Sequence, residues 1–178
     1  ACRALCLDRE EPWSQHALAH VLLTQGRIEE GTQFLEAHSS GWGALTSFMY
    51  THLWWHLALF YLARGRVDDA ILVFDNHCWA RDRNFSQDQI GAVSLLLRME
   101  LAGIDVGTRW KDMGPYLASR SRDVSQPFLT LQYLYGLLRA DRPEGNELLE
   151  HIRRITAQDV GEDAKTWCEV ATPLAHGL

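Results

Sequence analysis

One stretch of the sequence occurs twice, and this internal repeat limits the possible folds more than any other feature. Residues 20–31 read HVLLTQGRIEEG and residues 59–70 read LFYLARGRVDDA. Each copy runs from an apolar helical segment through Gly-Arg to a β-branched residue, two acidic residues and a small residue. The offset of 39 residues, from Gly26 to Gly65, indicates a helix-turn-helix unit repeated along the chain.

The second copy has the residue spacing of a tetratricopeptide repeat, in which small residues let two helices approach closely and large ones fill the seams. The positions that fit are Trp54, Leu57, Ala58, Tyr61, Ala70 and Phe74. We therefore predict an all-α, tetratricopeptide-like α-solenoid of stacked antiparallel helix pairs. One array is expected over residues 1–178, with repeats near 12–38, 45–78, 87–120 and 127–155.

Glycine and proline place the ends of the predicted helices. Gly26, Gly65 and Gly103 each follow an apolar run and suit the left-handed residue that ends a helix. Pro12 and Pro143 suit the first turn of a helix. The predicted helices cover residues 1–7, 12–25, 28–37, 45–63, 67–78, 87–102, 108–120, 127–139, 143–155 and 162–175. The segments 1–7 and 162–175 are partial helices without polar caps, so we expect the chain to be part of a longer array.

Composition excludes several classes of function. Hydrophobic residues make up 47% of the chain and the net charge is −6, so a continuous core is expected and disorder is not. Lysine occurs only at Lys111 and Lys165, and no basic cluster offers a track for nucleic acid. The longest apolar run is too short to span a bilayer. Four cysteines without a CxxC pair indicate reduced thiols and a cytoplasmic protein.

The most informative polar residues are two pairs of histidines. His16 and His20, like His52 and His56, lie four residues apart, so both rings of each pair fall on one side of a helix. The two helices open adjacent repeats, and such first helices stack side by side in a solenoid. We expect His16, His20 and His52 to line one concave wall, with His56 and Asp75 at its edge.

Four converging imidazoles are typical of a site for a zinc-like divalent metal, because nitrogen ligands suit its tetrahedral coordination. The metal-ligand candidates are His16, His20, His52 and His56. Asp75 is the candidate to orient a ring by accepting its N–H. The zinc-protease signature HExxH is absent, since Trp54 and Trp55 stand between His52 and His56.

The same wall also fits a function without metal or cofactor. Stacked repeats form a concave groove that binds a protein, a peptide or a small ligand. The candidates for such a groove are Trp13, His16, His20, His52 and Trp55. We favour this non-catalytic scaffold, on the analogy of its fold, over a metalloprotein or enzyme that uses the four histidines. No nucleophile elbow or glycine-rich phosphate loop points to a catalytic residue.

Three stretches also resemble a known family. They are residues 16–31 (HALAHVLLTQGRIEEG), residues 52–60 (HLWWHLALF) between Trp42 and Asp75, and residues 94–110 (SLLLRMELAGIDVGTRW). Together they resemble the tetratricopeptide-repeat protein 38 family over roughly residues 1–176. The resemblance implies a cytosolic helical-repeat protein and carries no settled biochemical role. The chain departs from the family where it reads LTLQ at residues 129–132 instead of a polar Asn-Asp-x-His stretch, and at Gly91–Ala92, where the family has an acidic residue.

Overall fold

The computed structural model describes residues 1–158 and 163–178, apart from the side chain of Ser47. The described residues form helices and connecting loops and contain no strand. This confirms the predicted all-α fold. The chain divides into two compact units, Ala1–Ile104 and Asp105–Leu178. None of the helices in the described part of the chain is long and apolar enough to cross a membrane.

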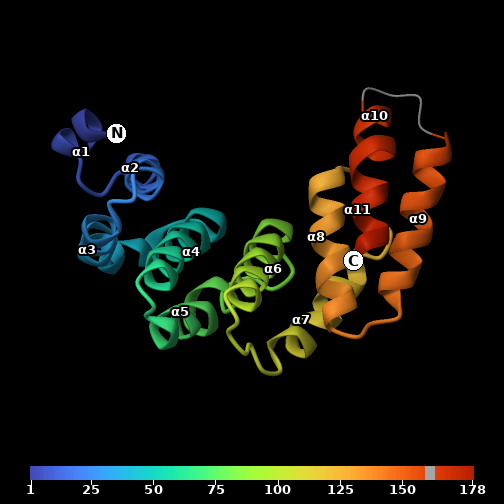
Figure 1. The fold of residues 1–178 in the computed structure, drawn as a ribbon. Helices are drawn as coiled ribbons and strands as arrows, with labels where there is room; N and C mark the ends of the chain where they lie inside the picture. Colours follow the sequence, from blue (N-terminus) through green and yellow to red (C-terminus); the bar gives the residue numbers. More distant parts are fainter. Residues whose placement is uncertain (159–162) are drawn as a thin grey trace. The chain divides into compact units, whose positions relative to one another are not determined.

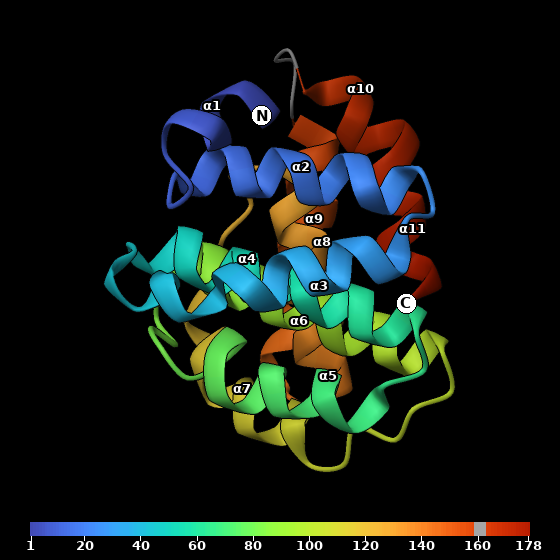
Figure 2. The same ribbon diagram turned by 90° about the vertical axis from the view of Figure 1, so that its left-hand side faces the viewer.

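The first unit is a stack of antiparallel helix pairs. Its elements are α1 (Cys2–Leu7), α2 (Pro12–Thr24), α3 (Ile28–His38), the 3-10 helix η1 (Ser39–Ala44), α4 (Ser47–Ala63), α5 (Val67–Val73), the π-helical turn η2 (Phe74–Cys78) and α6 (Ser86–Leu101). Helix α4 contacts its partner α5, the preceding pair α2 and α3, and the following helix α6. As predicted, α2 and α4 are neighbours in adjacent repeats (Figures 1 and 2).

The turns after the first helices repeat one backbone motif. Gly26, Gly65 and Gly103 have φ values of 68°, 69° and 78°, and in each case the next amide donates a 2.9 Å bond to a carbonyl five residues earlier. This is the Schellman arrangement that satisfies the last carbonyls of a helix. Asp141, with φ 55°, makes the same turn, and the Arg142 amide donates to the Leu137 carbonyl at 2.9 Å. The same turn therefore forms at this position although aspartate stands in place of glycine.

The core of the first unit depends on small residues where two helices cross. Ala58 and Ala70 are fully buried, as the repeat pattern predicts. At Gly31, a Cβ would lie only 2.1 Å from Cε1 of Phe60, whose ring is also fully buried. Of the other positions in the repeat pattern, Leu57, Tyr61 and Phe74 are buried and Trp54 is half-buried. In the preceding repeat, Ala19 and Leu22 are buried and Leu18 is half-buried.

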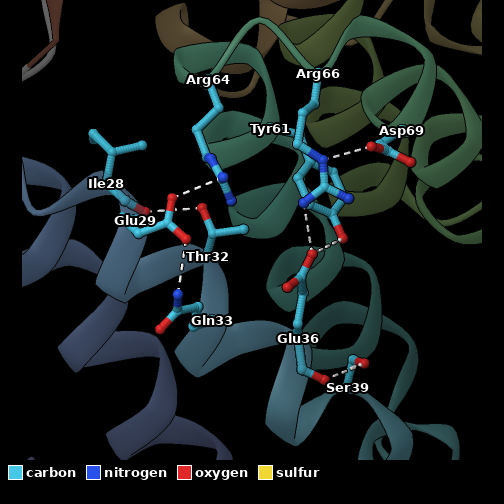
Figure 3. Close-up of polar contacts among 10 residues, drawn as sticks. All are labelled: Ile28, Glu29, Thr32, Gln33, Glu36, Ser39, Tyr61, Arg64, Arg66 and Asp69. Atoms are coloured by element: carbon cyan, nitrogen blue, oxygen red, sulfur yellow. Dashed lines mark hydrogen bonds and ion pairs between the residues drawn. The ribbon is translucent and has the colours of Figure 1, made fainter.

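An ion pair also recurs in the turns that follow α2 and α4, and Figure 3 draws the one in the second turn. Arg66 Nε donates to Asp69 Oδ2 at 2.6 Å, and Arg27 Nε donates to Glu30 Oε2 at 2.9 Å. The repeated Gly-Arg-x-acid-acid sequence thus encodes the same local ion pair twice. Such exposed pairs add little to stability because solvent screens them, so their main effect is to fix the turn.

The carboxylate of Glu36 links the first repeat to the second. Glu36 of α3 accepts a hydrogen bond from the Tyr61 hydroxyl of α4 at 2.9 Å and another from Arg66 at 2.8 Å (Figure 3). Burial and the bond to Glu36 raise the pKa of Tyr61 to about 12. The Tyr61 proton therefore stays in place at neutral pH, and the contact holds α3 against the end of α4.

The second unit contains the remaining helices. They are α7 (Arg109–Leu117), η3 (Ala118–Arg120), α8 (Pro127–Arg139), α9 (Glu144–Gln158), α10 (Ala164–Thr166), the π-helical turn η4 (Trp167–Ala171) and α11 (Thr172–Gly177). Helix α8 packs on α7 and α9, and α11 packs on both α8 and α9. Glu162, where the last helix was predicted to begin, lies outside the described residues. The boundary between the units falls within the predicted third repeat, and a single array over residues 1–178 stays a prediction.

Candidate functional site

Four histidines from two neighbouring helices meet in the first unit. We call His16 and His20 of α2 with His52 and His56 of α4 the histidine cluster. One ring nitrogen from each of the four lies within 4.8 Å of the others. His16 Nε2 is 2.9 Å from His20 Nε2 and 3.0 Å from His52 Nε2. The convergence of rings from different helices is confirmed, whereas their role as ligands stays a prediction.

The local structure explains why the rings meet. Each pair is four residues apart on its helix, so its two side chains lie over one another on the same face. Helices α2 and α4 pack directly against each other, and this contact brings the two faces together. The ring of His56 lies 4.5 to 4.9 Å, between centroids, from the rings of the other three.

Exposure differs strongly within the cluster. His20 is exposed, His16 and His52 are half-buried, and His56 is 1% exposed. Our expectation that His56 stands at the edge is therefore wrong. The rings of the other three histidines and of Trp55, which is 5.0 Å away between centroids, lie around this ring. Both ring nitrogens of His56 are buried and have no hydrogen-bond partner, which is a costly state for a polar group.

Burial also sets the charge of the cluster. It lowers the pKa of His16 below its usual value, that of His52 to about 4 and that of His56 to about 2, and neighbouring histidines add to each effect. These three rings are neutral at pH 7. A neutral imidazole keeps a nitrogen lone pair, which is the form that binds a metal.

Two contacts compete for one ring nitrogen of His16. A ring nitrogen of a neutral imidazole carries either one proton or one lone pair, so it forms one full hydrogen bond. His16 Nε2 has two short contacts, to His20 and to His52, and they compete for that one proton or lone pair. A cation among the four rings would accept the lone pairs of all of them at once.

Aromatic side chains hold the rings in orientation. His52 stacks on Phe48 at 5.1 Å with a 20° interplanar angle, and on Trp55 at 5.5 Å with an angle of 8°. Trp13 meets the edge of His16 at 6.1 Å and is 59% exposed. Ring contacts therefore link the five groove candidates, of which Trp13 and His20 are exposed.

Asp75 is not one of the four residues of the histidine cluster. It lies in η2, which continues the second helix of its repeat, and it is exposed, whereas the cluster forms between the first helices α2 and α4. Neither ring nitrogen of His56 has a hydrogen-bond partner, so Asp75 does not accept a bond from that ring, and its role in orienting another ring of the cluster stays a prediction. Stacking on Phe48 and Trp55 orients the ring of His52.

The sequence of the site region also matches a known family. The family model of the tetratricopeptide repeat matches residues 12–37 and 51–71, which together contain all four histidines of the cluster. The paired helices and the repeated turns agree with that match. The chain is a tetratricopeptide-like helical-repeat protein. No solved structure matches it.

Some features of this tetratricopeptide-like protein had weak signals in its sequence. Phe48 lies one helical turn before His52, and this spacing could have revealed the stacking. Thr51 donates to the buried carboxylate of Asp88 at 2.8 Å, but the two residues are far apart in sequence and no motif connects them. They help to line a pocket of about 10 Å³ beside His52 and Trp55, which has room for about one water molecule.

The adjacent residues His77 and Cys78 do not form a catalytic pair. His77 Nδ1 lies 2.6 Å from the Tyr50 hydroxyl, and its ring stacks on Trp54 at 3.6 Å. Cys78 is buried, and burial together with the charge of Asp88 raises the pKa of its thiol. A buried neutral thiol is a poor nucleophile.

Proposed function

We propose that this helical-repeat protein binds one divalent transition metal, of the zinc class, at the histidine cluster. The observation that carries the proposal is the meeting of one ring nitrogen from each of four histidines within 4.8 Å. In a tetrahedral site with metal–nitrogen distances of about 2.0–2.1 Å, ligand nitrogens lie about 3.3–3.4 Å apart. The contacts in the cluster start at 2.9 Å, so small ring movements would bring the nitrogens to these distances.

The chemistry of the donors supports the choice of metal. The cluster offers neutral imidazoles and, among the described residues, neither a thiolate nor a carboxylate. Imidazole suits zinc, cobalt, nickel and copper, whereas magnesium and calcium require oxygen ligands. A bound metal would also remove the competition at His16 Nε2 and satisfy one of the two unpaired nitrogens of His56. The scaffold supplies the preformed arrangement that lowers the cost of binding.

The test is a calorimetric titration of the chelator-treated protein with zinc chloride at pH 7. The key variant is His56→Leu, because leucine fills the buried position without leaving unpaired nitrogens. We expect one zinc ion per chain in the native sequence and no high-affinity zinc in His56→Leu, although the variant stays folded. His151→Leu is the control, since His151 lies on α9 and its Nδ1 contacts the Glu147 carbonyl. Equal zinc binding by His56→Leu and the native protein would refute the proposal.

A second candidate function is the binding of a peptide segment of a partner protein. Tetratricopeptide repeats commonly act as interaction scaffolds, and Trp13 presents a large apolar side chain to solvent beside the cluster. Large exposed aromatic residues are frequent anchors at protein interfaces.

The peptide-binding function is tested by selecting binders from a displayed peptide library with the metal-free chain. Selected peptides should lose affinity for a Trp13→Ser variant and keep it for Leu72→Ser, a change at an exposed apolar residue of α5. Peptides that bind both variants equally would exclude Trp13 as the anchor. Metal-dependent selection would instead join the two candidate functions at one site.

A further inference from the structure

A metal bound at the histidine cluster, on which this inference rests as it does on the proposed function, would retain its whole positive charge. Four neutral imidazoles neutralise none of the charge of a divalent ion. Among the described residues, no Asp, Glu or Cys belongs to the group of potential ligands. Because His56 is buried and His16 and His52 are half-buried, solvent screens this charge only in part. Such a site favours an additional or substitute ligand that is negatively charged.

The four histidines are not equivalent as ligands. His56 is enclosed, and His52 lies between Phe48 and Trp55. His20 is exposed, and its ring packs on the rings of His16 and His56, each at 4.5 Å between centroids. A ring at the solvent side with few constraints leaves a metal more easily than one held by stacking. His20 is therefore the ligand that is most easily exchanged.

The surface beside His20 offers a path for a replacement ligand. An open hollow of about 280 Å³ is lined by His20, Val21, Thr24 and Gln25. Thr24, which lies one helical turn after His20, is among the lining residues, and a threonine hydroxyl can donate a hydrogen bond to an anion. This open surface leaves His20 accessible to a small solute from solvent.

We infer that the metal-loaded cluster is an anion-binding site, in which a small monodentate anion such as a carboxylate takes the position of His20. His16, His52 and His56 keep the metal, and the anion enters from the hollow beside His20. Three protein ligands with a fourth, exchangeable position are the arrangement of zinc sites that bind substrates, in contrast to closed structural sites. The exchange is a ligand substitution and needs no oxidant or reductant.

The experiment uses the whole chain loaded with one equivalent of cobalt, whose visible spectrum reports the ligands of the metal. Sodium azide and sodium acetate are titrated into the cobalt protein at pH 7. We expect saturable changes in the visible bands. We also expect His20→Ala to retain cobalt and to bind azide at least about tenfold more tightly, because the competing ring is gone. His151→Ala should match the native protein.

The outcomes separate this inference from the proposed function. If the chain does not bind cobalt, the proposed metal site itself is wrong. If cobalt binds but azide and acetate leave its spectrum unchanged in both the native protein and His20→Ala, the metal site stands and the anion inference is overturned. Loss of cobalt from His20→Ala with retention in His56→Leu would also overturn it, because His20 would then be an essential ligand.

Discussion

The contact between Gly31 and Phe60 allows the packing of adjacent repeats to be tested with a single methyl group. A Cβ added at residue 31 would lie 2.1, 2.4 and 2.9 Å from three carbons of the Phe60 ring, whereas carbon atoms in contact are about 3.5–4.0 Å apart. The ring is fully buried and has no solvent-filled space to enter. Helix α3 or the ring must therefore move by more than about 1 Å.

The size of the effect follows from two opposing terms. Overpacking of this kind costs about 1–3 kcal/mol, and a displacement this large belongs at the upper end. Alanine gains about 1 kcal/mol over glycine inside a helix. We therefore expect Gly31→Ala to lower the free energy of unfolding by about 2 kcal/mol. Gly91 is the matched control, because it also lies within a helix but a Cβ there meets nothing within 4 Å; Gly91→Ala should stabilise by about 0.5–1 kcal/mol.

The assay is urea unfolding followed by far-ultraviolet circular dichroism, with all variants compared at equal m-values. The Gly31→Ala and Gly91→Ala variants should differ by about 3 kcal/mol. A Phe60→Leu change should cost less in the Gly31→Ala background than in the native one, since leucine makes room for the methyl group. Equal stability of the two alanine variants would refute the close approach of α3 and α4 and, with it, the alignment of the repeats.

Three further variants or conditions test other parts of the structure. Gln15→Leu removes the acceptor of the 2.8 Å bond from Trp42 Nε1 and should destabilise by about 1–3 kcal/mol in urea unfolding; a change below about 0.5 kcal/mol would contradict this. Asp141→Gly should stabilise by about 0.5–1 kcal/mol in the same assay, because glycine adopts the φ of 55° without strain, and a loss of stability would show that the aspartate side chain supports the turn. Lowering the pH from 7 to 5 should destabilise the metal-free chain by up to about 2 kcal/mol for each of His52 and His56. These rings stay neutral in the folded state because burial lowers their pKa values to about 4 and about 2, while the unfolded chain takes up protons below its ordinary pKa of 6.5. Urea unfolding at a series of pH values measures this, and constant stability down to pH 5 would contradict it.

The helices and turns were largely predictable because their signals are local. Gly26, Gly65 and Gly103 occupy backbone conformations that glycine adopts most easily, so the residue type itself marks the turn. The fourth turn has Asp141 at the same place, and there only the following proline gave a signal. The 3-10 helix around Trp42 and the π-helical turn at Phe74 were not predicted. Both depart from regular helical spacing, and tertiary packing determines them.

The candidate site was predictable to the extent that helix geometry determines it. The four-residue spacing of the histidines, together with the stacking of first helices, is sufficient to bring the rings together. The burial of each ring could not be predicted from this spacing, since it depends on how the side chains of α4 pack against α2. This is why the burial of His56 and the stacking of Phe48 were missed. Asp75 lies in η2, which continues the second helix of its repeat, and its role in orienting a ring stays a prediction.

The most direct test of the central claim is the zinc K-edge X-ray absorption spectrum of the whole chain loaded with one equivalent of zinc at pH 7. Four imidazole ligands predict a first shell of nitrogen at about 2.0–2.1 Å, with the outer-shell pattern of imidazole rings and no sulfur at about 2.3 Å. The same spectrum from His56→Leu should show fewer imidazole rings or unbound, hydrated zinc. A sulfur shell in the native protein, or a hydrated zinc spectrum with no imidazole pattern, would contradict a metal site in the histidine cluster.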